Sequence, residues 1–513
     1  MLKADYYTAP TDLDRLIFEK LVPADHYLRQ VKAAIDFEPM RALVADCYSP
    51  TMGRGAEDPV MMLKLSVLQF QDQLSDREVI EAAQVNLAYR FFLDLSLESQ
   101  LPVASLLSQF RARLGAQRLA QVFDDILRQA RAHGVVKDRL RLKDATHVIA
   151  CVAIPTTIRL VAQVRERVLR AAQSLDAEAV ARQHQRAADI RQATRHSNDQ
   201  QRLLERVEHL REIVAWADSW PTPLESRGLS QSQQAELSRS LELAHKVLND
   251  RQEQAHDQVR SAVDPDVRTG RHHGYYNGYL LDVSLDADSE LICALEVLAA
   301  NGDEAANTKA LIEAEEATQD NDIAAVSLDS IGFRGDVLRE LEAEPGPQVD
   351  VYVPPYPWPG SPPGLFKPED FQLNETGDEL RCPGGQTTRS RTRANRGRGW
   401  QFQFRQRHCR DCAVRQQCLK PETRTGRTVV KSDYEAEYTR ARQRALTDDY
   451  QAVRKEHPKI ERKLAEMIRW HGGRRVRYRG RWRVKIQYLL TACVVNIKRL
   501  VKLLTASPLP RPA

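Results

Sequence analysis

Apolar side chains recur at helical spacing through the first 135 residues. Side chains three and four positions apart share one face of a helix, and this spacing is seen at Leu16, Ile17, Leu21, Met61, Leu65 and Leu68. Ser75 and Glu78 form the pattern of a capping box, which predicts a helix beginning after Ser75. A further helix is predicted from Ser105 and should end at Gly115. We expect residues 1–135 to form an all-helical domain, either with a helix-turn-helix or as a plain bundle.

From residue 139 onward, several segments alternate polar and apolar residues or are continuously apolar, which indicates strands. Strands are expected at residues 139–144, ending in Asp144, and at 279–283, 291–297, 323–328 and 349–353. Helices are expected at 303–316 and 336–344. Residues 156–260 are rich in Ala, Arg, Gln, Glu and Leu, and predict long amphipathic helices arranged as a hairpin. The interleaving of strands and helices predicts an α/β core over residues 136–353 with a helical insertion at about 156–260.

The last third of the chain begins with a proline-rich segment. Seven of the 15 residues from Pro354 to Pro368 are proline, which indicates a linker. A cysteine-bearing, arginine-rich segment follows, and together they form a predicted insertion over residues 354–431. Helices expected at 459–470 and 485–504 make residues 432–513 the C-terminal helical part of the core.

The composition of the 513 residues excludes several classes of protein. Apolar residues make up 42% and charged residues 28%, so extensive disorder is excluded. No stretch has the roughly 18 to 20 uncharged apolar residues of a membrane helix, and the N-terminus lacks the apolar run of a signal peptide. We therefore expect a cytoplasmic protein with no membrane partner. Eight cysteines in a chain of this length do not predict a disulfide framework.

Positive charge is concentrated in two stretches. Residues 381–431 hold 14 Lys or Arg against two acids, and residues 454–485 hold 13 against three. The rest of the chain carries a net charge of −17. Aromatic residues such as Trp400, Trp470 and Trp482 lie among the arginines, which favours a nucleic acid as the partner over a solvated basic surface. Within the second stretch, the predicted DNA-binding residues are Arg469, Arg474, Arg475, Arg477, Arg479 and Arg481.

Three carboxylates stand where a catalytic metal site could form. Asp144 and Asp329 are each expected at the end of a strand, 185 residues apart, and Glu461 follows 132 residues later in the first turn of a helix. Carboxylates at the ends of neighbouring strands face the crevice in which α/β sheets bind ligands. If they converge, they can hold two Mg²⁺ ions about 4 Å apart and support phosphodiester cleavage. The alternative is that the three carboxylates have no catalytic function. Each aspartate would then stabilise a turn or cap a helix, and Glu461 would be an ordinary acidic residue on the surface of its helix.

Four cysteines in the arginine-rich segment have the spacing of a metal site. Cys382, Cys409, Cys412 and Cys418 are separated by 26, 2 and 5 residues. Four thiolates complete the tetrahedral shell of a structural Zn²⁺, and such a shell leaves no position for a catalytic water. The alternative is four free thiols. The other four cysteines lie in apolar contexts and are expected in the core.

Motifs occur in a fixed order around these residues. Those of the core are Asp144–Thr146, Asp264–Gly270, Tyr276–Tyr279, Ala300–Asp303, Ser327–Phe333, His457–Ala465, Arg469–Gly480 and Val495–Leu500. Those of the N-terminal region are Leu74–Glu78, Arg90–Leu95 and Leu107–Gly115. This order resembles the DDE transposases of bacterial insertion sequences, the group with an InsH-like N-terminal domain and a ribonuclease-H-like catalytic core.

The resemblance implies a specific activity. Asp144, Asp329 and Glu461 fall on the family's Asp-Asp-Glu triad, which binds Mg²⁺ or Mn²⁺. A member of this family binds the ends of its element as double-stranded DNA, cleaves there and transfers the strand to target DNA, with a homodimer as the expected active form. Two alternatives remain open: a ribonuclease-H-like nuclease without strand transfer, and a non-catalytic DNA-binding protein.

Overall fold

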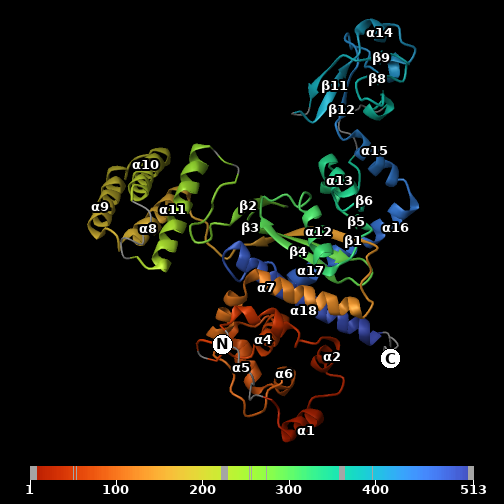
Figure 1. The fold of residues 1–513 in the computed structure, drawn as a ribbon. Coiled ribbons are helices and arrows are strands. Elements are labelled where there is room, and N and C mark those ends of the chain that lie inside the picture. Colours follow the sequence, from red (N-terminus) through yellow and green to blue (C-terminus); the bar gives the residue numbers. More distant parts are fainter. Residues whose placement is uncertain are drawn as a thin grey trace. The chain divides into compact units, whose positions relative to one another are not determined.

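A computed structural model describes residues 9–49, 51–53, 55–220, 229–253, 255, 257–272, 274–356, 364–394 and 397–506 of the chain (Figure 1). The chain divides into two compact units. Unit 1 comprises residues 1–136, 145–304 and 461–513, and unit 2 comprises residues 137–144 and 305–460. Two elements contribute residues to both units: strand β1 (Arg141–Ile149) and helix α17 (Pro458–Trp470).

The N-terminal part of unit 1 is helical, as predicted. Its helices are α1 (Asp12–Leu21), α2 (Tyr27–Ala34), α3 (Met40–Leu43), α4 (Pro59–Gln71), α5 (Asp76–Val85), α6 (Leu87–Phe92) and α7 (Ser105–Ala132), with a 3-10 turn, η1 (Ala45–Cys47). The capping box predicted at Ser75 is confirmed, because its side chain accepts from the Glu78 amide and the Glu78 carboxylate accepts from the Ser75 amide. α4 is buried along nearly its whole length.

Helix α7 departs from the sequence prediction at Gly115. That residue has φ 63° and interrupts the helical geometry, but the helix resumes and continues to Ala132. Glycine tolerates this left-handed value of φ, so the chain bends there instead of ending the helix. Leu119, Val122 and Phe123 beyond the bend are buried, and α7 packs against α18 (Arg481–Ala506).

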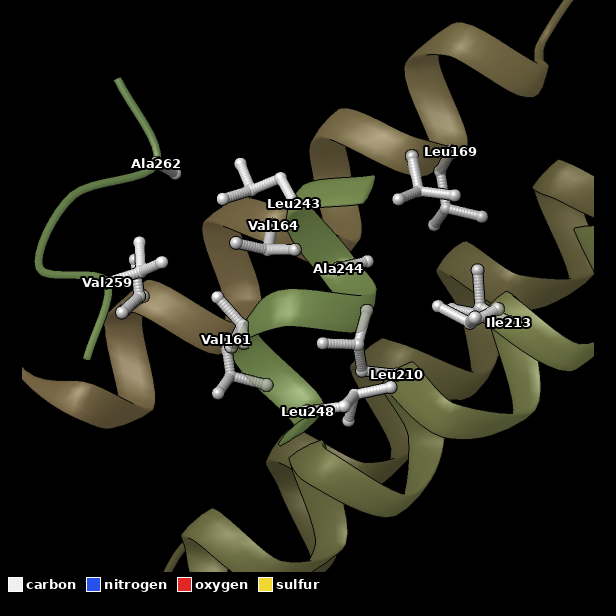
Figure 2. Close-up of a cluster of buried hydrophobic side chains, with 14 of the residues drawn as sticks. Val161, Val164, Leu169, Leu210, Ile213, Leu243, Ala244, Leu248, Val259 and Ala262 are labelled. Atoms are coloured by element: carbon white, nitrogen blue, oxygen red, sulfur yellow. The ribbon is translucent and has the colours of Figure 1, made fainter. Parts of the chain in front are cut away.

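The insertion between β1 and the next strand contains four helices in the residues that the structure describes. These are α8 (Thr157–Ala172), α9 (Ala177–Ala193), α10 (Asp199–Asp218) and α11 (Gln231–Gln252). The predicted amphipathic helices are confirmed, but the predicted hairpin is wrong. Asp176, Asn198 and Ser230 each cap a new helix by accepting a backbone N–H. Figure 2 shows their shared core, in which Val161 and Val164 of α8, Leu210 and Ile213 of α10, and Leu243 and Leu248 of α11 pack together.

The central strands make the protein a mixed α/β structure, as predicted. In unit 1, β2 (Arg268–Arg271), β3 (Tyr275–Asp286) and β4 (Ile292–Ala299) pair antiparallel. In unit 2, the start of β1 pairs in parallel with β5 (Ala325–Ser327), which pairs in parallel with β6 (Asp350–Tyr352). Helices α12 (Thr308–Gln319) and α13 (Gly335–Glu342) lie between these strands in sequence. The sheet is therefore mixed, antiparallel on one part and parallel on the other.

Strand β1 corrects the prediction that a strand ends at Asp144. The strand continues through Ile149, because the β-branched residues Thr146, Val148 and Ile149 favour an extended backbone. Asp144 is therefore an interior residue of β1 and the last residue that β1 contributes to unit 2.

The cysteine-bearing segment folds as a small β module in unit 2. Its strands are β7 (Gln372–Leu373), β8 (Leu380–Arg381), β9 (Thr387–Thr388), β10 (Arg391–Ala394), β11 (Gly399–Gln403) and β12 (Thr428–Ser432), in two antiparallel three-stranded sheets. Short helical turns are η4 (Pro368–Asp370), α14 (Gln406–Arg410) and η6 (Arg415–Gln417). The core of the module is Phe371, Leu380, Phe402, Phe404 and Val429.

Two helices, α15 (Glu435–Arg444) and α16 (Asp448–Glu456), complete unit 2 before α17 begins. At the other end of the chain, α18 is the most apolar helix of the C-terminal region, and α2, α4, α7 and β4 pack against it. No helix among the residues described is both long and apolar enough to span a lipid bilayer.

A buried ion pair anchors β1 in unit 2. The Arg141 guanidinium and the Glu315 carboxylate of α12 are both fully shielded from solvent. Arg141 Nε lies 3.1 and 3.0 Å from the two carboxylate oxygens, and Nη2 lies 2.7 Å from Oε1. The remaining guanidinium donors reach the Lys137 carbonyl at 2.6 Å and Asp138 Oδ1 at 2.8 Å. These contacts hold the short segment 137–144 on unit 2.

Replacing Glu315 tests how much this pair stabilises unit 2. Glu315→Gln removes the buried counter-ion of Arg141 and leaves only the partly exposed Asp138 as its charge partner, so we expect a loss of up to about 3 to 5 kcal/mol of unfolding free energy. The matched control is Glu313→Gln on the same helix, where Glu313 forms a more exposed pair with Lys309 and the expected loss is below about 1 kcal/mol. Urea unfolding of both variants measures the difference, and equal losses would contradict an anchoring role.

Candidate active site

Asp144 and Asp329 lie on neighbouring parallel strands of unit 2. Arg141 of β1 is opposite Val326 of β5, and Leu142 is opposite Ser327. Asp144 and Asp329 each follow this paired segment by two residues. Both aspartates are half-buried. The sheet thus places two aspartates that are 185 residues apart in the sequence on neighbouring strand segments.

The chain turns at Asp329, directly after β5. Leu328 donates its N–H to the Tyr352 carbonyl of β6 at 2.9 Å, which keeps the strand paired up to that point. Asp329 then caps the 3-10 turn η3 (Ser330–Gly332), because its Oδ1 accepts the Ile331 N–H at 3.1 Å. One carboxylate oxygen therefore fixes the backbone of the turn, while the side chain stays partly open to solvent.

A buried polar cluster supports the end of β5 immediately before Asp329. His457 Nδ1 lies 3.0 Å from Ser327 Oγ, and the His457 side chain is buried. Arg454 of α16 donates to the Leu328 carbonyl at 2.8 Å and to Ser327 Oγ at 3.2 Å. This cluster joins the segment that leads into α17 to the strand end that carries Asp329. Sequence reasoning missed Ser327, because nothing in the sequence pairs it with residues 127 and 130 positions away.

The imidazole of His457 is held neutral by its surroundings. Burial, together with the smaller effect of the nearby Arg454 charge, lowers the pKa of His457 to about 4. A neutral ring can exchange a hydrogen bond with Ser327 Oγ without adding charge beside Arg454. His457 therefore acts as a structural polar group at neutral pH.

Glu461 belongs to unit 1, whereas the two aspartates belong to unit 2. It lies in the first turn of α17, where the helix dipole favours a negative charge. Its side chain is exposed and makes no hydrogen bond or ion pair with any residue described. The predicted helix over 459–470 is confirmed as α17, with Glu461 four residues after His457.

The carboxylates have the donor chemistry that a hard divalent cation requires. Mg²⁺ and Mn²⁺ bind carboxylate oxygens, and they are commonly held by one or two carboxylates together with water and substrate phosphates. Asp144 and Asp329 supply such oxygens from adjacent strands, so the residues fit the ion. Across the described ranges, no three Asp, Glu, His or Cys side chains converge as a ready metal-binding group.

The four predicted cysteines all line one small cavity in the β module, of about 20 Å³. Cys382 Sγ accepts the Gln386 N–H at 3.3 Å, and Gly384 leaves room for the sulfurs, since a Cβ there would lie 2.9 Å from Cys412 Sγ. Burial raises the pKa of Cys418 to about 11, and the other three thiols act on it in the same direction. The thiols are therefore close enough to interact, although they do not converge as a formed metal-binding group.

The other four cysteines divide into two groups. Cys293 and Cys493 are buried, as expected from their apolar contexts. Cys47 is only half-buried and Cys151 is exposed, so the expectation of a core position is wrong for these two. Cys47 lies in a 3-10 turn and Cys151 follows directly after β1, so neither sits on the inner face of a regular element.

The predicted DNA-binding arginines of the C-terminal stretch divide by exposure. Arg474 and Arg477 are half-buried and donate to the backbone carbonyls of His147 and Leu74, the latter at 2.9 Å. Arg477 also lies over the Phe70 ring. Arg469, Arg475, Arg479 and Arg481 are exposed. Beside Arg469, a groove of about 560 Å³ is lined by Arg462, Lys498 and the exposed ring of Trp470.

The His457 pKa predicts a pH dependence of stability. The unfolded imidazole titrates near pH 6.5, whereas the folded one stays neutral down to about pH 4. The free energy of unfolding that the neutral His457 ring contributes is therefore fully present above pH 6.5. It is lost as the pH falls toward 4, by up to about 3 kcal/mol. We expect His457→Asn to weaken the dependence of the melting temperature on pH in this window. The exposed control His133→Asn should leave that dependence unchanged. An unchanged slope in His457→Asn would contradict the buried neutral ring.

Comparison with known families finds two transposase domains in the chain. Residues 16–113 match the family described as Transposase domain (DUF772), and residues 381–501 match the family described as Transposase DDE domain. The first match covers most of helices α1–α7, and the second includes the four cysteines, Glu461 and the C-terminal arginines. No match was found among curated proteins or among solved structures. The two matched domains, in this order along one chain, support a DDE transposase of an insertion sequence.

Proposed function

We propose that the protein binds the ends of its insertion sequence as double-stranded DNA, cleaves the DNA there and joins the freed end to target DNA. The observation that carries the proposal is the parallel pairing of β1 with β5, because Asp144 and Asp329 each follow the paired segment by two residues. The proposed catalytic triad is Asp144, Asp329 and Glu461. The match to a transposase DDE domain over residues that include Glu461 supports its inclusion.

The proposal includes a ribonuclease-H-like core. It is supported by the strand arrangement, in which β3 and β4 pair antiparallel while β1, β5 and β6 pair in parallel. Ligands of such sheets bind beyond the carboxyl ends of the parallel strands. Asp329 follows β5 after Leu328, and Asp144 follows the part of β1 that pairs with β5, so the proposal puts both aspartates at the end of the parallel pairing.

The chain's own residues would position the reacting DNA. Asp144 and Asp329 would hold Mg²⁺ or Mn²⁺, with Glu461 completing the ligand set, and the ions would activate the attacking hydroxyl and neutralise charge on the leaving oxygen. Asp329 is pre-positioned by its cap on η3. The Ser327–His457–Arg454 cluster keeps the end of β5 in place without adding a titrating group at neutral pH.

DNA binding is proposed for the exposed C-terminal arginines and the groove beside them. Arg469, Arg475, Arg479 and Arg481 present guanidinium groups to solvent, where they can contact phosphates. Trp470 is 69% exposed and can stack on a base. Arg474 and Arg477 are assigned a structural role, because their guanidinium groups already donate to backbone carbonyls. A homodimer acting on two paired ends is part of the same proposal.

The catalytic triad is tested by isosteric replacement. We expect Asp144→Asn, Asp329→Asn and Glu461→Gln each to reduce cleavage of end-bearing DNA about a thousandfold or more, equivalent to about 4 kcal/mol. DNA binding should persist, because the carboxylates act mainly in the chemical step. The measurement is single-turnover cleavage with Mg²⁺, alongside equilibrium binding.

The control for the triad is Asp322→Asn, which removes an exposed carboxylate before the amino end of β5 and should leave cleavage unchanged. Cleavage within tenfold of wild type in any triad variant would remove that residue from the site. Joining of the cleaved end to a second duplex distinguishes a transposase from a nuclease. If the wild-type protein shows no metal-dependent cleavage, the remaining hypothesis is a non-catalytic DNA-binding protein.

We also propose that Cys382, Cys409, Cys412 and Cys418 hold one structural Zn²⁺ ion. The support is the single cavity that all four line and the Gln386 N–H that already donates to Cys382 Sγ. Hydrogen bonds of this kind orient and stabilise a thiolate ligand. The core cluster of the module has five buried apolar residues among those described, so an ion would supply a large part of its folding free energy.

The zinc proposal predicts a measurable metal content. We expect about one Zn²⁺ per chain by elemental analysis, lost in Cys409→Ser/Cys412→Ser. The control is Cys47→Ser/Cys151→Ser, which replaces two cysteines outside the module and should keep the metal. A wild-type protein without zinc, in which all four thiols of the module react freely with an alkylating agent, would refute the site.

A further inference from the structure

The helical insertion carries an arginine-lined cleft of about 900 Å³. Its lining comes from α8, the end of α9 and the start of α11, together with Ala262 and Val263. Five of the lining side chains are arginine (Arg159, Arg165, Arg167, Arg170 and Arg191) and two are glutamate (Glu166 and Glu236). The cleft therefore carries a net positive charge and lies outside both sequence stretches that composition singled out as basic.

The sequence of α8 explains why one face of this helix is basic. Leu160, Val161, Val164, Val168 and Leu169 are buried in the core of the insertion, several of them visible in Figure 2. Arg159, Gln163, Glu166 and Arg170 recur at intervals of three or four residues and line the cleft. The apolar face thus holds α8 on the bundle and leaves its arginine face toward the cleft.

The cleft has guanidinium groups that the protein leaves without partners. Arg159, Arg170 and Arg191 are exposed, and none forms a hydrogen bond or ion pair with a residue that the structure describes. Arg165 is 5% exposed, and its Nε is buried with no hydrogen-bond partner in the described part of the chain. Its Nη2 contacts only the neighbouring Glu166, at 2.7 Å.

Each of the two glutamates of the cleft interacts with more than one basic side chain. Glu166 also lies 3.5 Å from His184, and Glu236 contacts both Arg167 and Arg239. Behind the cleft, the positive charges of Arg165 and Arg191 add to burial in lowering the pKa of Arg206. The positive charge is therefore not neutralised within the bundle, and an anion would relieve it.

The spacing of the arginines identifies the class of anion. Arg159 and Arg170 are 11 residues apart on one helix, which corresponds to about 16 Å along its axis. A single phosphate or carboxylate cannot reach both, whereas successive phosphates of a DNA strand can. We propose that this cleft binds the sugar-phosphate backbone of DNA, as a second DNA contact separate from the C-terminal arginines. The inference rests on the proposed function, because it assumes that DNA is the substrate.

The test compares three sets of substitutions in the full-length protein. The cleft set is Arg159→Gln/Arg170→Gln/Arg191→Gln. The control set on the same bundle is Arg182→Gln/Arg186→Gln/Arg211→Gln, since each of these arginines already pairs with a glutamate that does not line the cleft. The C-terminal set, Arg475→Gln/Arg479→Gln/Arg481→Gln, reports on the proposed DNA contact elsewhere in the chain. Binding to one duplex is titrated over a range of salt concentrations.

The cleft set should flatten the slope of log K against log salt by up to about 2.7, from about 0.9 for each lost phosphate contact. Its Kd at 0.1 M salt should rise by up to about two orders of magnitude. The control set should change neither value. Replacing the same three cleft residues with lysine should largely restore binding, because lysine keeps the charge at a phosphate. Circular dichroism verifies that the helices of each variant are intact.

Two results would overturn the inference. One is an unchanged salt slope in the cleft set while the C-terminal set flattens it, which leaves DNA binding in place but not at the cleft. The other is an equal effect of the cleft and control sets, which shows only a response to net charge. If the wild-type protein binds no DNA and no set changes its behaviour, the proposed function itself fails, independently of the cleft.

Discussion

The buried ion pair between Arg141 and Glu315 is the constraint on which the candidate site of unit 2 depends. It fixes the eight-residue segment 137–144 beside α12 and thereby sets the register of β1 against β5. Because residues of parallel strands advance together, this register also fixes which residue lies opposite Asp329. A slip of one residue would remove Asp144 from that position and turn its side chain to the other face.

A second set of polar contacts acts from the opposite side of β5. Ser327, His457 and Arg454 hold the strand end just before Asp329, and Asp329 itself caps the following turn. Ser327 and His457 are buried, Arg454 and Asp329 are half-buried, and all four are hydrogen-bonded. His457 is also neutral at physiological pH. Buried polar groups with their partners satisfied favour one arrangement over others, since each alternative leaves a donor or acceptor unpaired. Rigid placement of a carboxylate is what metal-dependent chemistry requires.

Positive charge on this chain divides into groups with different physical roles. Arg141, Arg474 and Arg477 serve carboxylate or backbone acceptors inside their own units, and their removal would affect stability first. Arg475, Arg479 and Arg481 are exposed, as are Arg159, Arg170 and Arg191 of the insertion. Sequence composition grouped the C-terminal arginines as one basic stretch and missed the cleft, because Arg191 of α9 joins the arginines of α8 only in the folded bundle.

Local sequence patterns were enough to predict the class of many helices and strands and the chemistry available to them. Alternating and helical periods gave the helical N-terminal region, the strands and the C-terminal helices, because those periods are local properties of the chain. The spacing of four cysteines and the three carboxylates marked the candidate ligands in the same way. The sequence could not give the sheet partners of β1 past Asp144 or the buried partner of His457. Those depend on contacts between residues more than a hundred positions apart, and only the tertiary structure decides which distant groups meet.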